Sequence, residues 1–305
     1  MSMHSRRDFL KTSSAALLYG SAFLRGNSLL AQSLGLPLGL QLYSVRELLP
    51  TDYEGTLKQI GTLGYREVEA AGFYNHSASH VKQAMKNAGL HCVSAHYSFD
   101  NLHAQFDEVL AFYKELGVSY IICSGSSFKN PSRVKNMKPR DRAHAFTLED
   151  WRWTAEQANK FGEKVSAAGM KFGYHNHFME FQKQDGVVPY IELLKLTDPS
   201  KVTMELDCGW VVVGGGNPIE LLERYPTRIS MLHVKDFKLT NKPEPVTHRP
   251  SSTELGRGSI DYRPILQAAA KTGHVRHCFV EQEQFDMPPM QALKVDAEYM
   301  RKLNA

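Results

Sequence analysis

Short apolar runs rich in β-branched residues alternate with longer amphipathic stretches along most of this chain. Eight runs have the length and composition of buried strands, at residues 38–43, 65–70, 90–96, 118–123, 170–176, 201–207, 228–234 and 276–282. Apolar residues at helical spacing mark the segments between them, for example 53–63, 78–87, 104–116, 148–168, 219–224 and 262–271. Eight strands that each precede a helix close a parallel barrel, so the pattern predicts a single (β/α)8 TIM barrel of the α/β class over residues 37–305.

Glycine ends five of the predicted helices, at the position where a helix often stops on a left-handed residue: Gly64, Gly89, Gly117, Gly169 and Gly273. The main rival fold is an open, doubly wound sheet, which would carry a glycine-rich phosphate turn after its first strand. Residues 42–46 contain no glycine, and the glycines at 214–216 lack the required spacing. Two long connections, at 124–147 and 236–260, fall on the face where barrels carry out chemistry, so we expect substrate loops there.

The first 31 residues have the pattern of an export signal. Arg6 and Arg7 precede a short, weakly apolar stretch at about 12–24, which is typical of a twin-arginine signal, although an amphipathic helix with a chance arginine pair would look similar. The stretch is too short and too polar to span a bilayer, and no later segment qualifies as a membrane span. We therefore predict a twin-arginine signal peptide over residues 1–31 and a periplasmic or otherwise exported location.

Most of the net charge of +4 belongs to this N-terminal segment, which holds four basic residues and one acid. Without it, 32 basic and 31 acidic residues remain. A nearly neutral chain lacks the positive surface that binds nucleic acid, so we expect no nucleic-acid partner. The four cysteines show no metal-ligand spacing, and buried free thiols are expected.

Ionisable residues end most of the predicted strands, where an ordinary barrel strand would end in apolar or small ones. They are Glu69, His96, His175 with His177, Asp207, His233 with Lys235, and Glu281 with Glu283. Residues two apart on a strand share a face, so each of these pairs, and Glu205 with Asp207, can point into the barrel mouth. His96 could still be a satisfied core histidine, and Glu205 a structural partner of a neighbouring side chain.

So many ionisable groups in one barrel mouth are costly unless they pair with one another or bind a metal. Mixed histidine and carboxylate ligands suit Mn²⁺, Zn²⁺, Co²⁺ or Mg²⁺. We therefore expect one divalent metal ion that acts as a Lewis acid on a carbonyl or on a pair of hydroxyls.

Seven short motifs, taken in their order and spacing, resemble those of the xylose isomerase-like barrel family, whose members are commonly labelled sugar phosphate isomerase/epimerase. They lie at residues 39–44 (GLQLYS), 64–69 (GYREVE), 173–177 (GYHNH), 205–207 (ELD), 232–236 (LHVKD), 255–261 (LGRGSID) and 280–282 (VEQ). The resemblance covers the chain from about residue 37 to its end. It implies one metal held by residues of strands five to eight, often Glu, Asp, His and Glu.

Asp207, His233 and Glu281 match the last three of these ligand positions. At the first position many epimerases of the family have a Glu, whereas this chain has His175 as the closest match and Glu180 slightly further on. The resemblance also implies a role for Lys235 and Asp236, which follow the metal histidine. The resulting candidate ligands are His175, Asp207, His233 and Glu281, and the candidate catalytic residues are Glu281, Lys235, His96 and Glu69.

The histidine at the first position bears on the reaction. A two-base isomerase or epimerase places a carboxylate on each face of its substrate, and here Glu281 is the one matched carboxylate suited to act as a base. Glu69 or Glu283 could supply the second base. A site with one base and a metal is better suited to elimination next to a ketone, as in the inosose dehydratases of the same superfamily, whose fifth-strand motif is similarly rich in histidine.

The family label favours an isomerase or epimerase that abstracts a proton next to the carbonyl of an unphosphorylated sugar or keto-sugar. The alternative is a lyase or hydratase that acts on a 3-keto-sugar or keto-glycoside. An enzyme like the apurinic endonucleases is disfavoured because it needs a basic DNA-binding face, and a non-catalytic sugar-binding barrel would not need the converging polar strand ends. Candidate contacts to a small-molecule carbohydrate are His177, Trp210, Tyr43 and Glu283.

Overall fold

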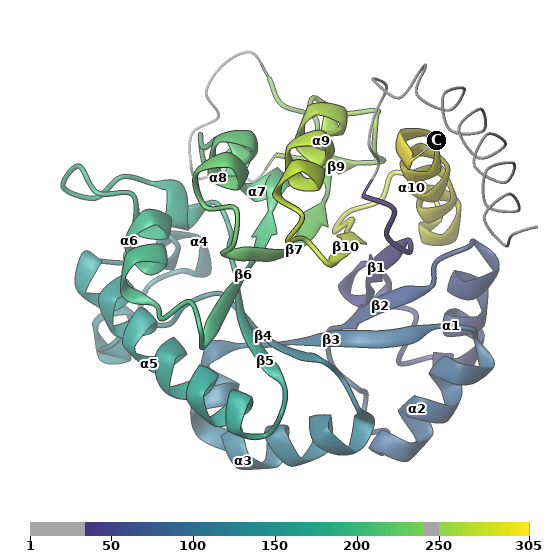
Figure 1. Ribbon diagram of the computed structural model, residues 1–305, viewed down its shortest axis with the longest axis horizontal. Coiled ribbons are helices and arrows are strands. Elements are labelled where there is room, and N and C mark those ends of the chain that lie inside the picture. The colour runs from purple at the N-terminus through teal and green to yellow at the C-terminus, as the bar shows by residue number, and fades with distance from the viewer. Residues whose placement is uncertain (1–33, 241–249, 305) are drawn as a thin grey trace, which may run out of the picture.

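Eight parallel strands form a closed barrel in the computed structural model, which describes residues 34–240 and 250–304. Around the barrel they neighbour one another in the order β1-β10-β7-β6-β5-β4-β3-β2. Their bounds are β1 Gly39–Gln41, β2 Glu67–Ala70, β3 His91–Tyr97, β4 Tyr120–Ser124, β5 Lys171–His175, β6 Val202–Asp207, β7 Ile229–Val234 and β10 His277–Val280. Figure 1 shows the ring of strands with helices packed outside it. The predicted TIM barrel is confirmed, and the predicted signal peptide at 1–31 lies outside the described residues.

A helix follows each barrel strand before the next one begins. These helices are α1 Tyr53–Thr62, α2 Ala78–Asn87, α3 Phe99–Leu116, α5 Leu148–Ala167, α6 Pro189–Leu196, α8 Pro218–Arg224, α9 Tyr262–Thr272 and α10 Pro289–Asn304. All five predicted helix-ending glycines have φ between 61° and 94°, which confirms their role because side chains with a Cβ rarely adopt that conformation.

Helix α3 begins five residues before the predicted start at residue 104. The Ser98 side chain caps it by accepting a hydrogen bond from the backbone N–H of Asn101. Apolar periodicity did not indicate this first turn because the helix is interrupted at Gln105, whose φ of −135° and ψ of 34° are not helical.

Short elements occupy the connections at the carboxyl ends of the strands. The connection after β4 contains η2 Pro131–Val134 and α4 Pro139–Arg142. The connection after β7 begins with β8 Asp236–Phe237, which pairs in antiparallel fashion with β9 Ser252–Thr253. Three further short helices follow strands: η1 Leu42–Val45 begins directly after β1, α7 Cys208–Val213 begins directly after β6, and η3 Met179–Phe181 begins shortly after β5.

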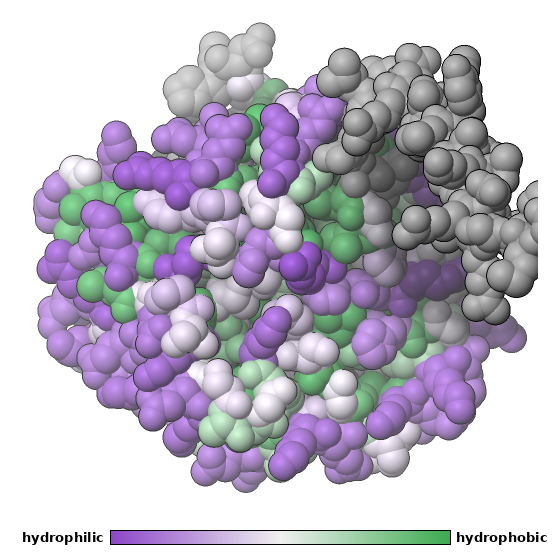
Figure 2. All heavy atoms as spheres, viewed as in Figure 1, coloured by the Kyte–Doolittle hydropathy of each residue, from purple (hydrophilic) through white to green (hydrophobic). Residues whose placement is uncertain are grey.

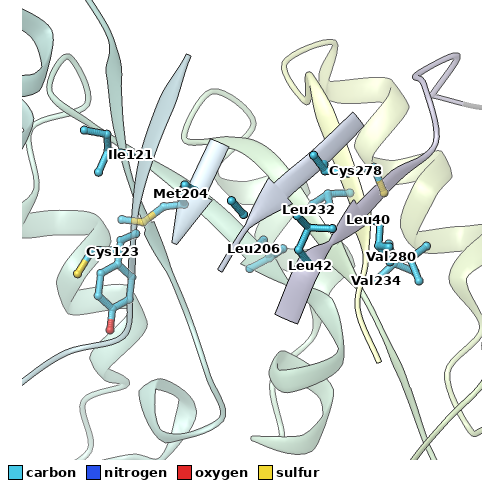
Figure 3. Packing of buried hydrophobic residues seen from close by; sticks show 14 of the residues in the cluster. Leu40, Leu42, Ile121, Cys123, Met204, Leu206, Leu232, Val234, Cys278 and Val280 are labelled. Carbon is cyan, nitrogen blue, oxygen red and sulfur yellow. The ribbon is translucent and has the colours of Figure 1, made fainter. Parts of the chain in front are cut away.

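The main hydrophobic core lies between the strands and the surrounding helices. Figure 3 shows part of it, with Leu40, Leu206 and Val234 among the buried side chains on the strands. A second, smaller cluster consists of Val93, Tyr120, Ile122, Met231 and Phe279. Met231 and Phe279 precede His233 and Glu281 by two residues and so share their face of the strand. The smaller cluster therefore fills the barrel interior beneath the polar strand ends.

The surface is mostly hydrophilic on the face shown in Figure 2, and the thiols are as predicted from the sequence. On this face, small apolar areas are scattered among hydrophilic residues (Figure 2). Within the described residues, no helix is both long enough and apolar enough to cross a membrane. All four cysteines are buried and free.

Helix α10 is anchored through a buried carboxyl group. The Asp296 side chain is 1% exposed and accepts a hydrogen bond from the backbone N–H of Leu255 at 2.7 Å. Burial raises the pKa of Asp296 to about 7, although the hydrogen bond from Leu255 acts in the opposite direction. The folded protein thus holds this proton more tightly than the unfolded chain does, whose aspartate pKa is about 3.9.

This shift predicts a pH-dependent effect on stability. Between about pH 4 and pH 7 the contribution of Asp296 to the free energy of unfolding should decrease as the pH rises, because the buried group must ionise, and above pH 7 it should level off. We expect Asp296→Asn, which keeps an acceptor oxygen for Leu255, to gain about 1–3 kcal/mol relative to the wild type between pH 5 and pH 8. Urea unfolding at several pH values measures this difference. The exposed Asp107→Asn serves as the control, and parallel pH profiles for the wild type and Asp296→Asn would contradict the prediction.

Candidate active site

The polar strand ends meet in one buried cluster at the carboxyl end of the barrel. Glu69, Glu205, Asp207 and His233 are fully buried, and His175, Lys235 and Glu281 are at most 5% exposed. His96 lies at the edge of the cluster, with its ring stacked on that of His233 at a centroid distance of 5.3 Å. Four carboxylates are thus withdrawn from water beside one lysine and three histidines, and each charge needs a compensating partner.

Two of the carboxylates orient histidine rings. Glu205 Oε2 lies 3.0 Å from His175 Nδ1, and Glu69 Oε1 lies 2.7 Å from His233 Nε2. If these nitrogens carry the protons, His175 Nε2 and His233 Nδ1 present lone pairs toward Asp207 Oδ2, at 3.8 and 3.9 Å. Histidines that bind metals usually donate their other N–H to a carboxylate in this way. Glu205 is thus placed as a structural partner of His175, and its role stays a prediction.

The side chains of His175, Asp207, His233 and Glu281 offer ligand atoms that all lie within 4.8 Å of one another. Nitrogen and oxygen ligands at 2.0–2.2 Å from an ion stand about 3.0–3.6 Å apart, so small shifts would suffice to enclose one. Within the described part of the chain, Asp207 Oδ2 is fully buried and faces cationic or ligand nitrogens only: Lys235 Nζ at 2.9 Å, His175 Nε2 at 3.8 Å and His233 Nδ1 at 3.9 Å. These four residues fit a divalent metal ion.

A second group of potential ligands overlaps the first and consists of His96, His175, Glu205 and His233. In it, Glu205 Oε2 already lies 2.7 Å from His96 Nε2 and 3.0 Å from His175 Nδ1. The first group contains a single such contact, between His233 Nδ1 and Glu281 Oε2 at 3.0 Å. Because its atoms are less fully paired with one another, we favour the first group as the metal site.

Charges within the cluster agree with this assignment. Burial holds the pKa of His175 well below its ordinary value, so His175 is neutral and can act as a ligand. Burial alone would lower the pKa of Lys235, but the carboxylates of Asp207 and Glu281 raise it well above the usual range, so Lys235 is protonated.

Lys235 and Asp236 point in opposite directions because they are adjacent in an extended segment. Lys235 Nζ lies 2.9 Å from Asp207 Oδ2, 2.6 Å from Glu281 Oε2 and 2.9 Å from Glu283 Oε1. The Asp236 carboxylate accepts backbone hydrogen bonds from Gly256, Gly258 and Ile260 at 3.0–3.1 Å. Lys235 thus belongs to the cluster, whereas Asp236 shapes the 255–260 loop. A Cβ at residue 258 would lie 2.2 Å from Asp236 Oδ1, which explains the glycine there.

The sequence did not reveal the residues that hold Glu69. Gln41 Nε2 donates to Glu69 Oε1 and Ser94 Oγ donates to Glu69 Oε2, both at 2.7 Å. In the sequence, Gln41 and Ser94 stand out only as polar residues within apolar strands. Such residues often have a purely structural role, so they did not indicate a functional site. Glu180 lies outside the ligand group: it accepts hydrogen bonds from Tyr174 Oη at 2.7 Å and from the His177 backbone at 3.1 Å.

The predicted substrate contacts lie around the cluster at different depths. Tyr43 is 41% exposed and lines a cavity of about 600 Å³ that His96 also lines. Glu283 lies beside Lys235, and the His177 ring is 5.1 Å from that of His175. Trp210 is 1% exposed and packs on Phe237 at 4.8 Å. Contact of these four residues with a substrate stays a prediction.

The chain resembles known proteins both in sequence and in fold. Residues 57–303 match the model of the family described as xylose isomerase-like TIM barrel. An inosose dehydratase of Clostridium botulinum (strain Alaska E43 / Type E3) is 25% identical over 252 residues, which cover 76% of this chain and 82% of that protein. A sugar phosphate isomerase/epimerase structure from Parabacteroides distasonis is 25% identical, with a TM-score of 0.70, over 88% of this chain and 98% of that one. The structure of IolI with a bound zinc atom is 14% identical, with a TM-score of 0.68, over 88% and 98% of the two chains.

The fold and the cluster define a TIM barrel with a potential metal site at the carboxyl ends of its strands. The chain belongs to the xylose isomerase-like TIM barrel family. Its relatives and structural neighbours include inosose dehydratases and sugar phosphate isomerases/epimerases, so the coarse expectation of an enzyme family is confirmed.

We expect the cluster to bind one divalent ion per chain. Asp207→Ala should abolish binding because it removes a ligand, whereas Glu205→Gln should weaken it about 10- to 100-fold because it disturbs only the orientation of His175. Titration of metal-free protein with Zn²⁺ and Mn²⁺ in a calorimeter gives both affinities, and Glu180→Gln is the control. A larger loss for Glu205→Gln than for Asp207→Ala would favour the second ligand group instead, because that group contains Glu205 and not Asp207.

Proposed function

We propose that this protein is a metal-dependent lyase that removes the proton next to a ketone of an unphosphorylated keto-sugar or keto-glycoside and expels an oxygen substituent from the following carbon. The observation that carries the proposal is which carboxylates of the cluster already contact other side chains and which oxygen stays available to act as a base. Histidines contact Glu69 and Glu205 on the atoms that orient their rings. Glu281 is contacted through Oε2, by His233 Nδ1 at 3.0 Å and by Lys235 Nζ at 2.6 Å, so its other oxygen is the one in position to act as a base. Support also comes from the curated relatives named inosose dehydratase, since a dehydratase eliminates water.

In this proposal a divalent ion is held by four residues, His175, Asp207, His233 and Glu281. The ion could be Mn²⁺, Zn²⁺, Co²⁺ or Mg²⁺. The structure of IolI, which has a similar fold, contains a zinc atom. When bound, the ion supplies Lewis acidity to the ketone oxygen. A neutral imidazole in place of a carboxylate suits this role because it leaves the ion with more positive charge.

The side chains then divide the remaining work. Glu281 takes the proton from the carbon next to the ketone, and the Lys235 ammonium, 2.6 Å from Glu281 Oε2, stabilises the negative charge that develops on the substrate. His96 gives a proton to the departing oxygen, because it is the cluster member that also lines the cavity within the described residues. The carbon–oxygen bond breaks, a carbon–carbon double bond forms next to the ketone, and water or an alcohol leaves.

A second candidate function is isomerisation or epimerisation of a sugar. Two carboxylates favour it: Glu283, whose Oε1 lies 2.9 Å from Lys235 Nζ, and Glu69, which could return a proton from another direction. The 25% identity to a sugar phosphate isomerase/epimerase from Parabacteroides distasonis supports the same alternative.

The reaction can be assigned by proton NMR in D₂O with Mg²⁺- or Zn²⁺-loaded protein and a panel of 3-keto-glucose, methyl 3-keto-glucoside and keto-inositol. We expect loss of water or methanol and an unsaturated ketone. Return of a deuterated epimer or isomer would instead establish the second candidate, and no exchange with any compound would point to a sugar-binding protein.

Lys235→Met should lower kcat about 10²- to 10³-fold because it removes the charge that faces the developing oxyanion. Lys235 is not a ligand, so metal content, measured in parallel, should stay at the wild-type level. Glu180→Gln, which alters a buried carboxylate away from the ligands, is the control. A variant with normal metal content and normal kcat would exclude this role of Lys235.

We also propose that the protein is exported through the twin-arginine pathway, on the strength of Arg6 and Arg7 ahead of the weakly apolar stretch. Replacing both arginines with lysine should retain the full-length precursor in the cytoplasm, as cell fractionation would reveal. Undiminished export of that variant would rule out the pathway.

A further inference from the structure

A cavity of about 600 Å³ opens beside the catalytic cluster and is larger than a single six-membered ring requires. Its walls come from η1, from the connection between β2 and α2, from the end of β3, and from one side of α3. His96 connects the two spaces: its Nε2 contacts Glu69 and Glu205 at 2.8 and 2.7 Å, and its side chain also lines the cavity. A substrate held at the cluster can therefore extend past His96 into the cavity.

The cavity walls are chemically suited to a neutral ring. Aromatic residues form much of the lining, namely Tyr43, Phe73, Tyr74, Tyr97, Phe112 and Tyr113. Amide and hydroxyl groups of Asn75, Asn101 and Ser98 stand between them, and the described lining contains no lysine or arginine. Aromatic faces with interspersed amides accept sugar or phenyl rings, whereas a phosphate or carboxylate would meet no lysine or arginine and would face the carboxylate of Glu108.

The aromatic wall is built from packed rings, and two of its residues have a left-handed backbone conformation. Phe73 packs on Phe112 at 4.8 Å and on Tyr113 at 5.6 Å. Tyr74 and Asn75 have φ of 51° and 62°, and they are two of only three non-glycine residues with positive φ in the described chain. Such conformations cost about 1 kcal/mol or more each and persist where the surrounding structure enforces them, often at binding sites.

We propose that this cavity is the subsite for the leaving group of a glycoside, so that the substrate is an uncharged 3-keto-glycoside with a ring-shaped aglycone and not a free keto-sugar. The inference rests on the proposed function for the identity of the first ring. With a ketone at carbon 3 of that ring, the acidic proton is on carbon 2 and the glycosidic oxygen is on carbon 1. Glu281 takes the proton, the carbon 1–oxygen bond breaks, carbons 1 and 2 become doubly bonded, and the aglycone leaves as an alcohol protonated by His96.

Binding of unreactive ligands tests the subsite without requiring turnover. Calorimetry with metal-loaded protein compares phenyl β-glucoside with glucose, neither of which has a ketone. We expect the glucoside to bind at least 10-fold more tightly. Asn101→Trp fills the cavity from α3 and should remove most of this difference. Ala104→Trp places the same side chain on an exposed position of α3 outside the cavity lining and should preserve it.

Equal affinity for the two ligands, or a difference that Asn101→Trp leaves intact, would overturn the subsite. Release of phenol from phenyl 3-keto-glucoside is then measured separately. If the glucoside binds selectively but no phenol is released, the subsite stands and the proposed lyase function fails. If 3-keto-glucose reacts but the binding difference is absent, the function stands and the subsite fails.

Discussion

The buried ammonium group of Lys235 is the interaction on which the arrangement of the site depends. It contacts three carboxylates, those of Asp207, Glu281 and Glu283, at 2.6–2.9 Å. In a dry barrel mouth, negative charges so close together would repel one another strongly without a cation between them. Lys235 therefore allows β6 and β10 to deliver their carboxylates to the same point while leaving room for a second positive charge, the metal that we propose.

The barrel strands place these charged side chains in successive layers along the barrel axis. Glu205 and Asp207 share a face of β6, and the first of them orients His175 while the second faces the ligand nitrogens. Glu69 has the same relation to His233 across the barrel. One layer of carboxylates thus fixes the rings, and the next layer is available for an ion. The apolar cluster of Met231 and Phe279 below closes the barrel to water, which strengthens every interaction above it.

The parts of this structure that follow from local sequence could be predicted, and those that arise from distant contacts could not. Strand periodicity indicated that Lys235 would share the face of His233, and glycine at helix ends indicated the positive φ of Gly117 and Gly273. The partnership of Glu69 with His233 joins residues 164 positions apart, and nothing local specifies it. The cavity likewise depends on how two loops fold over α3, including the interruption of that helix at Gln105.

The neutral side chain of His175, at a position where many epimerases of the family have a Glu, gives a reason why a barrel of this family could catalyse elimination. An ion bound by Asp207, Glu281 and two histidines would carry one more unit of positive charge than an ion with a third carboxylate. It would stabilise the deprotonated substrate more strongly, and the carboxylate that could return a proton to the opposite face would be missing. A long-lived anion next to a good leaving group expels it, particularly where an aromatic cavity beside His96 receives the departing ring. In the lyase that we propose, His175 would therefore lengthen the life of the anion and would leave a return of the proton to the more distant Glu69 or Glu283.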